Sequence, residues 1–335
     1  MLADYKLNIL DRVPEHYFRN AEQFKKTCDE LKLEIIPAVM SFGYSDGILA
    51  HDPNLAEGLP CRNLPLRIKD GRGVLAVDNS NLVPGDFEKR MGNTFLGWSF
   101  QDEPGSGTFA DSAVKHGGTT AFRIENPQGK EGNRRVSKVL KVRPWTQYHA
   151  SVWVRTEGFE SAGETRMFAI SSRGRTLSHS HLGVKRDQDW TEHHVIFNSL
   201  EDAEIRFYVG VWGCRGGKLW LDDVRLVEEP FVNLVRRSGC PLLVESEDRP
   251  MVFTEGRDFA PLHDPKLGMT PYAGNFEVYH SPPQLRIVPD SRIKEGEKLR
   301  VSWPPFASVG QPADPMLRLT EPLQSHEIRI LQATG

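Results

Sequence analysis

The sequence predicts a mixed fold, in which an antiparallel β-sandwich is joined to α/β segments. Residues 66–229 carry short runs that alternate apolar and polar side chains, separated by turns rich in Gly, Asn and Asp, which is typical of antiparallel sheets. Residues 1–58 instead place a helical repeat between two apolar runs, the pattern of a strand, a helix and a strand. Residues 230–335 hold α/β or irregular segments with two further strands. With 335 residues the chain is long enough for two domains.

The N-terminal α/β segment is predicted from its hydrophobic spacing. Leu7–Leu10 is a short apolar run, and Leu33–Met40 is a second one. Between them, from about Glu15 to Lys32, apolar residues recur every three or four positions with charged residues between them, which predicts an amphipathic helix. The two flanking strands should be parallel, because a helix connects them.

Alternation of side chains also places the strands of the sandwich. The predicted strands are Thr120–Ile124, Val136–Val142, Tyr148–Thr156, Arg166–Ser171, His193–Asn198, Ile205–Trp212 and Lys218–Leu226. After the sandwich, Gln284–Val288 and Lys298–Trp303 show the same pattern. The last thirty residues hold several prolines, and no regular element is predicted there.

Composition and charge exclude several classes of function. The net charge is −3 and both signs are mixed along the chain, so no nucleic-acid partner is expected. No apolar run reaches the roughly 18 residues of a membrane helix, and the first residues lack the pattern of a secretory signal. We therefore expect a soluble protein with no membrane partner, and its localisation stays open, including export of a longer natural chain. No P-loop, dinucleotide fingerprint or nucleophile elbow is present, so no organic cofactor is expected.

Two of the predicted strands combine aromatic and basic side chains on one face. In the first, Trp153 and Arg155 alternate with apolar residues; in the second, Arg206, Tyr208 and Trp212 do the same. If both rows face solvent together, the rings can cover the C–H face of a sugar while the guanidinium groups bond to its hydroxyls. The alternative is that these aromatic residues pack beneath a loop or against the flanking segments.

The order of landmarks from Asn81 to Val227 points to a family. The chain shows Asn81–Glu88, Gly97-Trp98, Lys115–Gly118 and Leu219–Leu226 in sequence. This order resembles the jelly-roll carbohydrate-binding modules of families 4, 9 and 22, which are β-sandwiches similar to galactose-binding domains and accompany many glycoside hydrolases. The resemblance implies a jelly-roll sandwich with an oligosaccharide or polysaccharide as partner.

The same resemblance implies a structural calcium ion. In such modules an acidic residue after the opening motif and an aspartate in the closing strand hold the ion. The matching positions here are Glu88 and Asp222 or Asp223. By strand parity Asp222 shares the face of Val224 and Leu226, which favours it as the ligand. The alternative is an exposed pair of acids in a turn, with no metal.

Catalytic candidates lie at the ends of the predicted strands outside the sandwich. The segment Leu10–His16, with the helix and strand that follow it, resembles the start of an α/β-barrel glycosidase, in which the chemistry lies at the C-terminal ends of strands. Asp11 is then a candidate acid, and Arg12 would bind a substrate hydroxyl or orient a carboxylate. Glu255 and Asp258 follow another apolar run. The alternative for Asp11 and Arg12 is a helix-capping and ion-pairing role.

Together these patterns predict a carbohydrate-active protein. The first hypothesis is a glycoside hydrolase, or part of one, that acts on a plant or microbial polysaccharide and carries its own carbohydrate-binding module. The alternative is a non-catalytic glycan-binding or interaction protein. A third hypothesis, an assembly module without a sugar ligand, gains support if Trp153 and Trp212 are buried against the flanking segments. The oligomeric state is not predicted.

Overall fold

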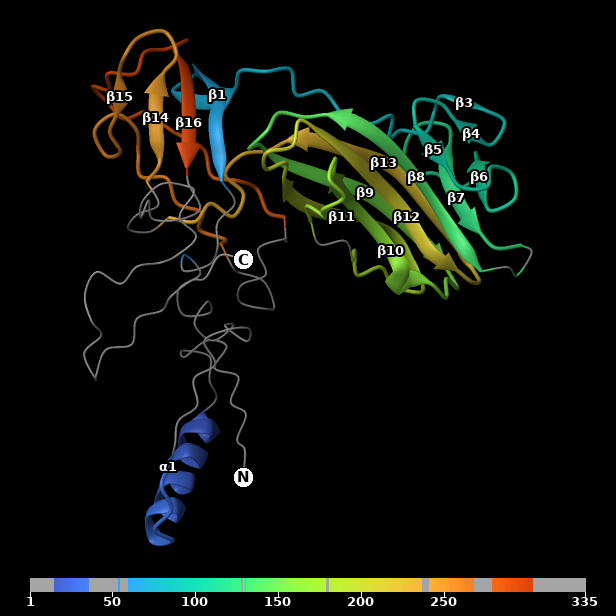
Figure 1. The fold of residues 1–335 in the computed structure, drawn as a ribbon, viewed down its shortest axis with the longest axis horizontal. Coiled ribbons are helices and arrows are strands. Elements are labelled where there is room, and N and C mark those ends of the chain that lie inside the picture. Colours follow the sequence, from blue (N-terminus) through green and yellow to red (C-terminus); the bar gives the residue numbers. More distant parts are fainter. Residues whose placement is uncertain are drawn as a thin grey trace.

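The computed structural model describes residues 15–35, 54, 60–127, 129, 131–178, 181–236, 241–267 and 279–303. In this part of the chain, α1 (Glu15–Glu30) is the only α-helix, and the strands form antiparallel sheets (Figure 1). The predicted helix is therefore present, but the α/β-barrel segments expected around it are not seen among these residues. Leu7–Leu10 and the predicted strand beyond Ile35 lie outside the described residues, and no described helix is long and apolar enough to cross a membrane.

Two sheets form the sandwich. The first, which we call the β12 sheet, has the order β10-β12-β8-β5, and the second, the β9 sheet, has the order β11-β9-β13-β7-β6. The strands are β5 (Phe100–Gln101), β6 (Thr108–Asp111), β7 (Ala121–Glu125), β8 (Gly132–Lys141), β9 (Gln147–Glu157), β10 (Thr165–Ser171), β11 (Gln188–Asn198), β12 (Glu204–Cys214) and β13 (Lys218–Glu228). A hairpin of β3 (Arg90–Met91) and β4 (Thr94–Phe95) and a short 3-10 helix, η3 (Ala162–Glu164), complete this part.

The two sheets enclose one hydrophobic core, and the period-two pattern explains it. Val152 and Val154 of β9 and Phe207 and Val209 of β12 are all fully buried between the sheets. The residues that alternate with them point away from the core. Burial of each such side chain stabilises the fold by roughly 1.5–3 kcal/mol relative to exposure. The predicted antiparallel β-sandwich is confirmed.

A second, smaller sheet is built from segments on both sides of the sandwich. Its order is β15-β14-β16-β1-β2, with β1 (Cys61–Lys69), β2 (Arg72–Leu75), β14 (Leu243–Ser246), β15 (Val252–Phe253) and β16 (Lys298–Trp303). Because β1 and β2 precede the sandwich and β14 follows it, the sandwich is inserted into this sheet (Figure 1). Residues 66–75 therefore belong to the small sheet and not, as predicted, to the sandwich. Local alternation does not reveal this, because β1 pairs with β16 more than 200 residues away.

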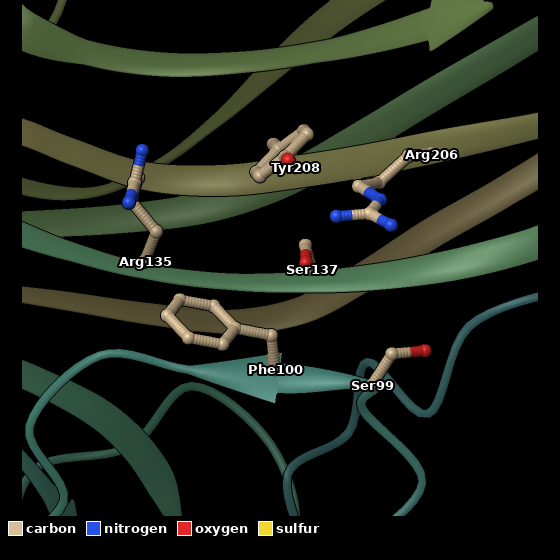
Figure 2. A pocket seen from close by; sticks show the side chains of 6 residues that line it. All are labelled: Ser99, Phe100, Arg135, Ser137, Arg206 and Tyr208. Carbon is tan, nitrogen blue, oxygen red and sulfur yellow. The ribbon is translucent and has the colours of Figure 1, made fainter. Parts of the chain in front are cut away.

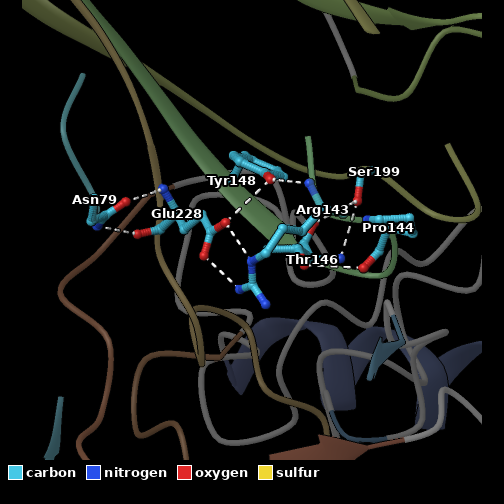
Figure 3. Close-up of polar contacts among 7 residues, drawn as sticks. All are labelled: Asn79, Arg143, Pro144, Thr146, Tyr148, Ser199 and Glu228. Carbon is cyan, nitrogen blue, oxygen red and sulfur yellow. Dashed lines mark hydrogen bonds and ion pairs between the residues drawn. The ribbon is translucent and has the colours of Figure 1, made fainter. Parts of the chain in front are cut away.

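A polar cluster fixes the end of the sandwich that faces the small sheet. The guanidinium of Arg143 donates two hydrogen bonds to the Glu228 carboxylate, at 2.8 and 2.6 Å. Asn79 exchanges two hydrogen bonds with the Glu228 backbone, and the Tyr148 hydroxyl accepts one from the Arg143 amide (Figure 3). Nearby, the Arg62 amide donates to a backbone carbonyl of the sandwich at 3.1 Å. The Arg62 bond links β1 of the small sheet to the sandwich, and the other bonds hold the end of the sandwich itself together.

Candidate functional site

One row of side chains crosses the outer face of the β12 sheet. Phe168 of β10 stands in register with Tyr208 of β12, Tyr208 with Ser137 of β8, and Ser137 with Phe100 of β5. The neighbours of these residues along each strand, such as Met167 and Val209, fill the core, so the row itself points outward. Three aromatic side chains and one hydroxyl are thereby aligned across four strands.

Three of the aromatic rings on this face form a cluster. The Phe168 and Tyr208 ring centroids are 5.4 Å apart with the rings 20° from parallel, and the Trp212 ring lies 5.1 Å from Phe168 and 6.2 Å from Tyr208. All three side chains are half-buried. They support one another at the separations that aromatic pairs prefer and still leave ring surface accessible to a ligand.

Two arginines flank the aromatic cluster. The guanidinium carbons of Arg135 and Arg166 lie 5.2 and 5.8 Å from the centre of the Trp212 ring. Both arginines stand in register with Gly210, which has no side chain to separate them. A Cβ atom at Gly210 would lie 2.4 Å from the Arg134 carbonyl oxygen, so only glycine fits there. Each guanidinium has a carboxylate partner: Asp102 for Arg135 at 2.8 Å and Glu164 for Arg166 at 2.6 Å.

The same face is hollowed beside Tyr208. A cavity of about 350 Å³ is lined by Ser99, Phe100, Arg135, Ser137, Arg206 and Tyr208, and Figure 2 shows Arg135 and Arg206 on opposite sides of the Tyr208 ring. A second cavity of about 320 Å³ adjoins it and shares Arg206 and Tyr208. Half-exposed rings beside guanidinium and hydroxyl donors can cover the C–H face of a small cyclic ligand and bond to its polar rim.

The predicted platform that combines both aromatic rows is wrong. Trp153 and Arg155 lie on β9, which pairs with β11 and β13 in the other sheet, whereas Arg206, Tyr208 and Trp212 lie on β12. Both rows point outward as parity predicts, but from opposite faces of the sandwich. Sequence spacing gives the direction of a side chain within its strand, and it does not give the sheet to which that strand belongs.

Trp153 is covered by a loop, as the alternative hypothesis for it proposed. The imidazole of His116 stacks on the Trp153 indole, with centroids 3.9 Å apart and rings 14° from parallel. Arg155 forms an ion pair with Glu157 at 2.9 Å on the same face. This face therefore offers less free ring surface than the β12 sheet.

The residues expected to hold calcium converge on the loop at residues 116–120, but N–H groups occupy their oxygen atoms. The Asp222 carboxylate accepts the amides of His116 and Gly117 at 2.8 and 3.2 Å, and Asp223 contacts the His116 ring at 2.7 Å. Glu88 accepts the Thr119 amide at 2.7 Å and also the Thr119 hydroxyl. No group of three His, Cys, Asp or Glu side chains able to hold a metal occurs among the described residues. Because N–H and O–H donors engage these oxygen atoms, the arrangement favours the metal-free alternative, and the calcium ion stays a prediction.

A β-bulge changes the face on which Asp222 lies. The pairing of β13 with β9 shifts register between Asp222 and Arg225, and Asp223 has a positive φ of 45°. Leu221 and Val224 therefore both enter the core, and Asp222 points outward beneath the loop rather than sharing the face of Val224. Asp222 is nevertheless fully buried, and desolvation raises its pKa to about 6 against the hydrogen bonds that lower it.

The described acids that were expected to be catalytic are held in structural ion pairs. Asp258 is fully buried, its carboxylate accepts hydrogen bonds from the Arg292 guanidinium, and these bonds hold its pKa far below the usual range. Glu255 pairs with Arg236 at 2.5 Å and accepts the Leu262 amide. A carboxyl with a strongly lowered pKa cannot act as the proton donor of a hydrolase. Asp11 and Arg12 lie outside the described residues.

Sequence reasoning found Arg206, Tyr208 and Trp212 but missed most of the site on the β12 sheet. Phe168 and Arg166 alternate with buried Met167 and Ala169 on a strand that was predicted, so the parity rule could have found them. Arg135 and Ser137 could have been found on β8 in the same way. Phe100 could not, because β5 is only two residues long.

Comparison with solved structures gives fold similarities at low sequence identity. A family 16 carbohydrate-binding module is 18% identical with a TM-score of 0.33, and the match covers 44% of this chain and 100% of that chain. The CBM22-1 xylan-binding domain of Paenibacillus barcinonensis Xyn10C is 16% identical with a TM-score of 0.35, over 46% of this chain and 97% of that one. TmCBM61 in complex with β-1,4-galactotriose is 18% identical with a TM-score of 0.33, over 44% and 99%. No protein-family model and no curated protein matches the chain.

Proposed function

We propose that the sandwich is a glycan-binding module and that its ligand lies on the outer face of the β12 sheet. The observation that carries this proposal is the cluster of Phe168, Tyr208 and Trp212, which is half-exposed and borders a cavity. Water hydrates an exposed aromatic patch unfavourably, and a sugar ring presents a flat C–H surface of matching size that can cover it. The landmark order from Asn81 to Val227, with its resemblance to jelly-roll carbohydrate-binding modules, supports the same ligand class.

Polar groups around the cluster supply the second half of sugar recognition. Ser99 offers a hydroxyl group, Ser137 lies almost fully covered at the cavity wall, and the guanidinium groups of Arg135 and Arg206 offer N–H donors there. Sugar hydroxyls both donate and accept hydrogen bonds, so such a mixed rim suits them better than a purely apolar or purely acidic one. Because Arg135 is held by Asp102, its donors are fixed in place before a ligand arrives.

Hydrolysis of the bound glycan stays a separate prediction. Among the described residues, Glu255 and Asp258 are engaged in ion pairs and lie in the small sheet region rather than on the β12 sheet. Binding without catalysis is therefore the function that the described geometry supports best. The hydrolase hypothesis stays a prediction, and its remaining candidate acid, Asp11, lies outside the described residues.

Calorimetric titration with oligosaccharides of β-glucan, xylan, mannan and galactan tests the proposal, with a reducing-end assay on the same samples. We expect saturable binding of at least one oligosaccharide, with no release of reducing ends. If none of the oligosaccharides binds at millimolar concentration, the glycan-binding proposal is wrong. If reducing ends are released, the protein is a hydrolase as well as a binder.

A further inference from the structure

Arg206 differs from the other two arginines of the β12 sheet in its surroundings. Arg135 and Arg166 each pair with a carboxylate, whereas Arg206 has no hydrogen bond or ion pair with any described residue. Its cross-strand neighbours are Ile170 on β10 and Val139 on β8, both apolar. The guanidinium is exposed at the point where the two cavities meet, so its charge is uncompensated within the site.

The nearest acid along the strand faces a lysine on the neighbouring strand. Glu204 precedes Arg206 by two residues on β12, lines the second cavity and points to the same face. It stands in register with Lys141 on β8, so opposite charges face each other across the strands at that position. Counting one negative charge at Glu204 and one positive charge at Lys141, Arg206 carries the excess positive charge beside Tyr208.

We propose that the ligand of this face is an anionic saccharide, whose carboxylate or sulfate group binds Arg206 while a sugar ring rests on Tyr208. This inference rests on the proposed glycan-binding function and names its ligand class. A guanidinium binds a planar carboxylate or a sulfate through two parallel N–H donors, and such charge-assisted bonds are stronger than neutral ones. The apolar flanks of Ile170 and Val139 reduce competition from water at the contact.

Matched pairs of oligosaccharides, alike except for charge, test the inference by calorimetric titration. One pair is an oligogalacturonate and its methyl ester, and the other is a sulfated galactan oligosaccharide and its desulfated form. The variants are Arg206→Gln, Arg206→Lys and Lys218→Gln. Lys218 is an exposed cation at the start of β13 in the opposite sheet, so its substitution removes one positive charge away from the site.

We expect at least one acidic oligosaccharide to bind at least about tenfold more tightly than its neutral partner. A tenfold difference in affinity is what one charge-assisted hydrogen bond contributes. The Arg206→Gln variant should lose this preference, Arg206→Lys should keep part of it, and Lys218→Gln should keep all of it. Which pair shows the preference distinguishes a uronate from a sulfate ligand.

Two other outcomes overturn the inference in different ways. If neutral and acidic members bind equally, or if Arg206→Gln leaves the preference intact, the ligand is not selected by this arginine, and the glycan-binding function still stands. If no member of either pair binds and the neutral panel also fails, the proposed function falls together with the inference.

Discussion

Phe168 and Tyr208 face each other in register on neighbouring strands, with their rings 5.4 Å apart on the outside of the sandwich. Two large apolar rings on a solvent-facing surface gain little for folding unless something covers them. Their arrangement with Trp212 beside a cavity makes binding the simplest physical reason for their position.

The opening motif of the sandwich depends on a glycine at position 85. A Cβ atom there would lie 1.8 Å from the Val224 carbonyl oxygen, and the Gly85 carbonyl accepts the Val224 amide at 2.9 Å. Gly85→Ala should therefore lower the free energy of unfolding by about 3 kcal/mol, because the backbone contact must open. Urea denaturation measures this loss. Gly163→Ala, at a site with nothing within 4 Å of the added carbon, is the matched control; equal stability of the two variants would contradict the close approach.

The buried Asp222 should make the stability fall as pH rises. Desolvation raises its pKa to about 6 in the folded state, whereas an aspartate in the unfolded chain titrates near about 4. The folded state thus binds more protons between these values, so the contribution is fully present below about pH 4 and is lost as pH rises through about 6. We expect a loss of up to about 3 kcal/mol over this window.

Comparison with Asp222→Asn isolates this effect, because asparagine does not titrate. The difference in unfolding free energy between wild type and variant should decline from pH 4 to pH 7, and a flat difference would show that the carboxylate is not desolvated. The series is run in EDTA and repeated with calcium. We expect the same unfolding free energies with and without calcium, because N–H groups already donate to the Asp222 carboxylate. A rise in the unfolding free energy of the wild type alone on addition of calcium would instead support a metal site.

The Arg143–Glu228 pair should contribute to stability because it ties the segment after β8 to the end of β13, across the two sheets of the sandwich. The Glu228 side chain is 11% exposed and accepts two hydrogen bonds from one guanidinium. Glu228→Gln leaves that cation without its anion, and we expect a loss of about 2 kcal/mol. Glu201→Gln removes a more exposed carboxylate from an arginine pair and should change stability by less than about 0.5 kcal/mol. Similar thermal midpoints for both variants would mean that the junction pair is not stabilising.

Asp258 is predicted to be structural and not catalytic. Its carboxylate is fully buried against Arg292, so Asp258→Asn should destabilise the protein by about 3 kcal/mol. Glu247→Gln, in a longer pair with Arg300 at 3.6 Å, should have little effect on the urea midpoint. A variant of Asp258 with wild-type stability that has lost a measurable release of reducing ends would assign the residue to catalysis instead.

Alternation of side chains in the sequence predicts where the strands lie, but it does not predict which strands pair. Alternation in Thr165–Ser171 and Glu204–Cys214 is clear, and it predicts which side chains leave the core. The sheet in which each strand lies follows from contacts between distant segments, and the sequence alone contains no local signal for them. Alternation alone therefore predicts one platform for Trp153 and Tyr208, although their strands lie in different sheets.

The predicted face of Asp222 was wrong for a related reason. Strict alternation assigns it to the face of Val224, but the bulge at Asp223 resets the parity of β13. The sequence of Leu221–Val224 does not predict a bulge, because its only unusual feature is two adjacent aspartates. The small sheet was also missed, since β1 pairs with β16 across more than 200 residues of the chain.

Paired variants on the two faces of the sandwich test the central claim most directly. Trp212→Ala removes a ring from the β12 sheet, and Trp153→Ala removes one from the opposite sheet, so each serves as the control for the other. The measurement is the dissociation constant, by calorimetric titration, of the oligosaccharide that binds the wild type best. We predict that Trp212→Ala weakens binding about tenfold or more and that Trp153→Ala changes it less than about twofold. Loss of binding in Trp153→Ala with full affinity in Trp212→Ala would contradict the assignment of the site to the β12 sheet.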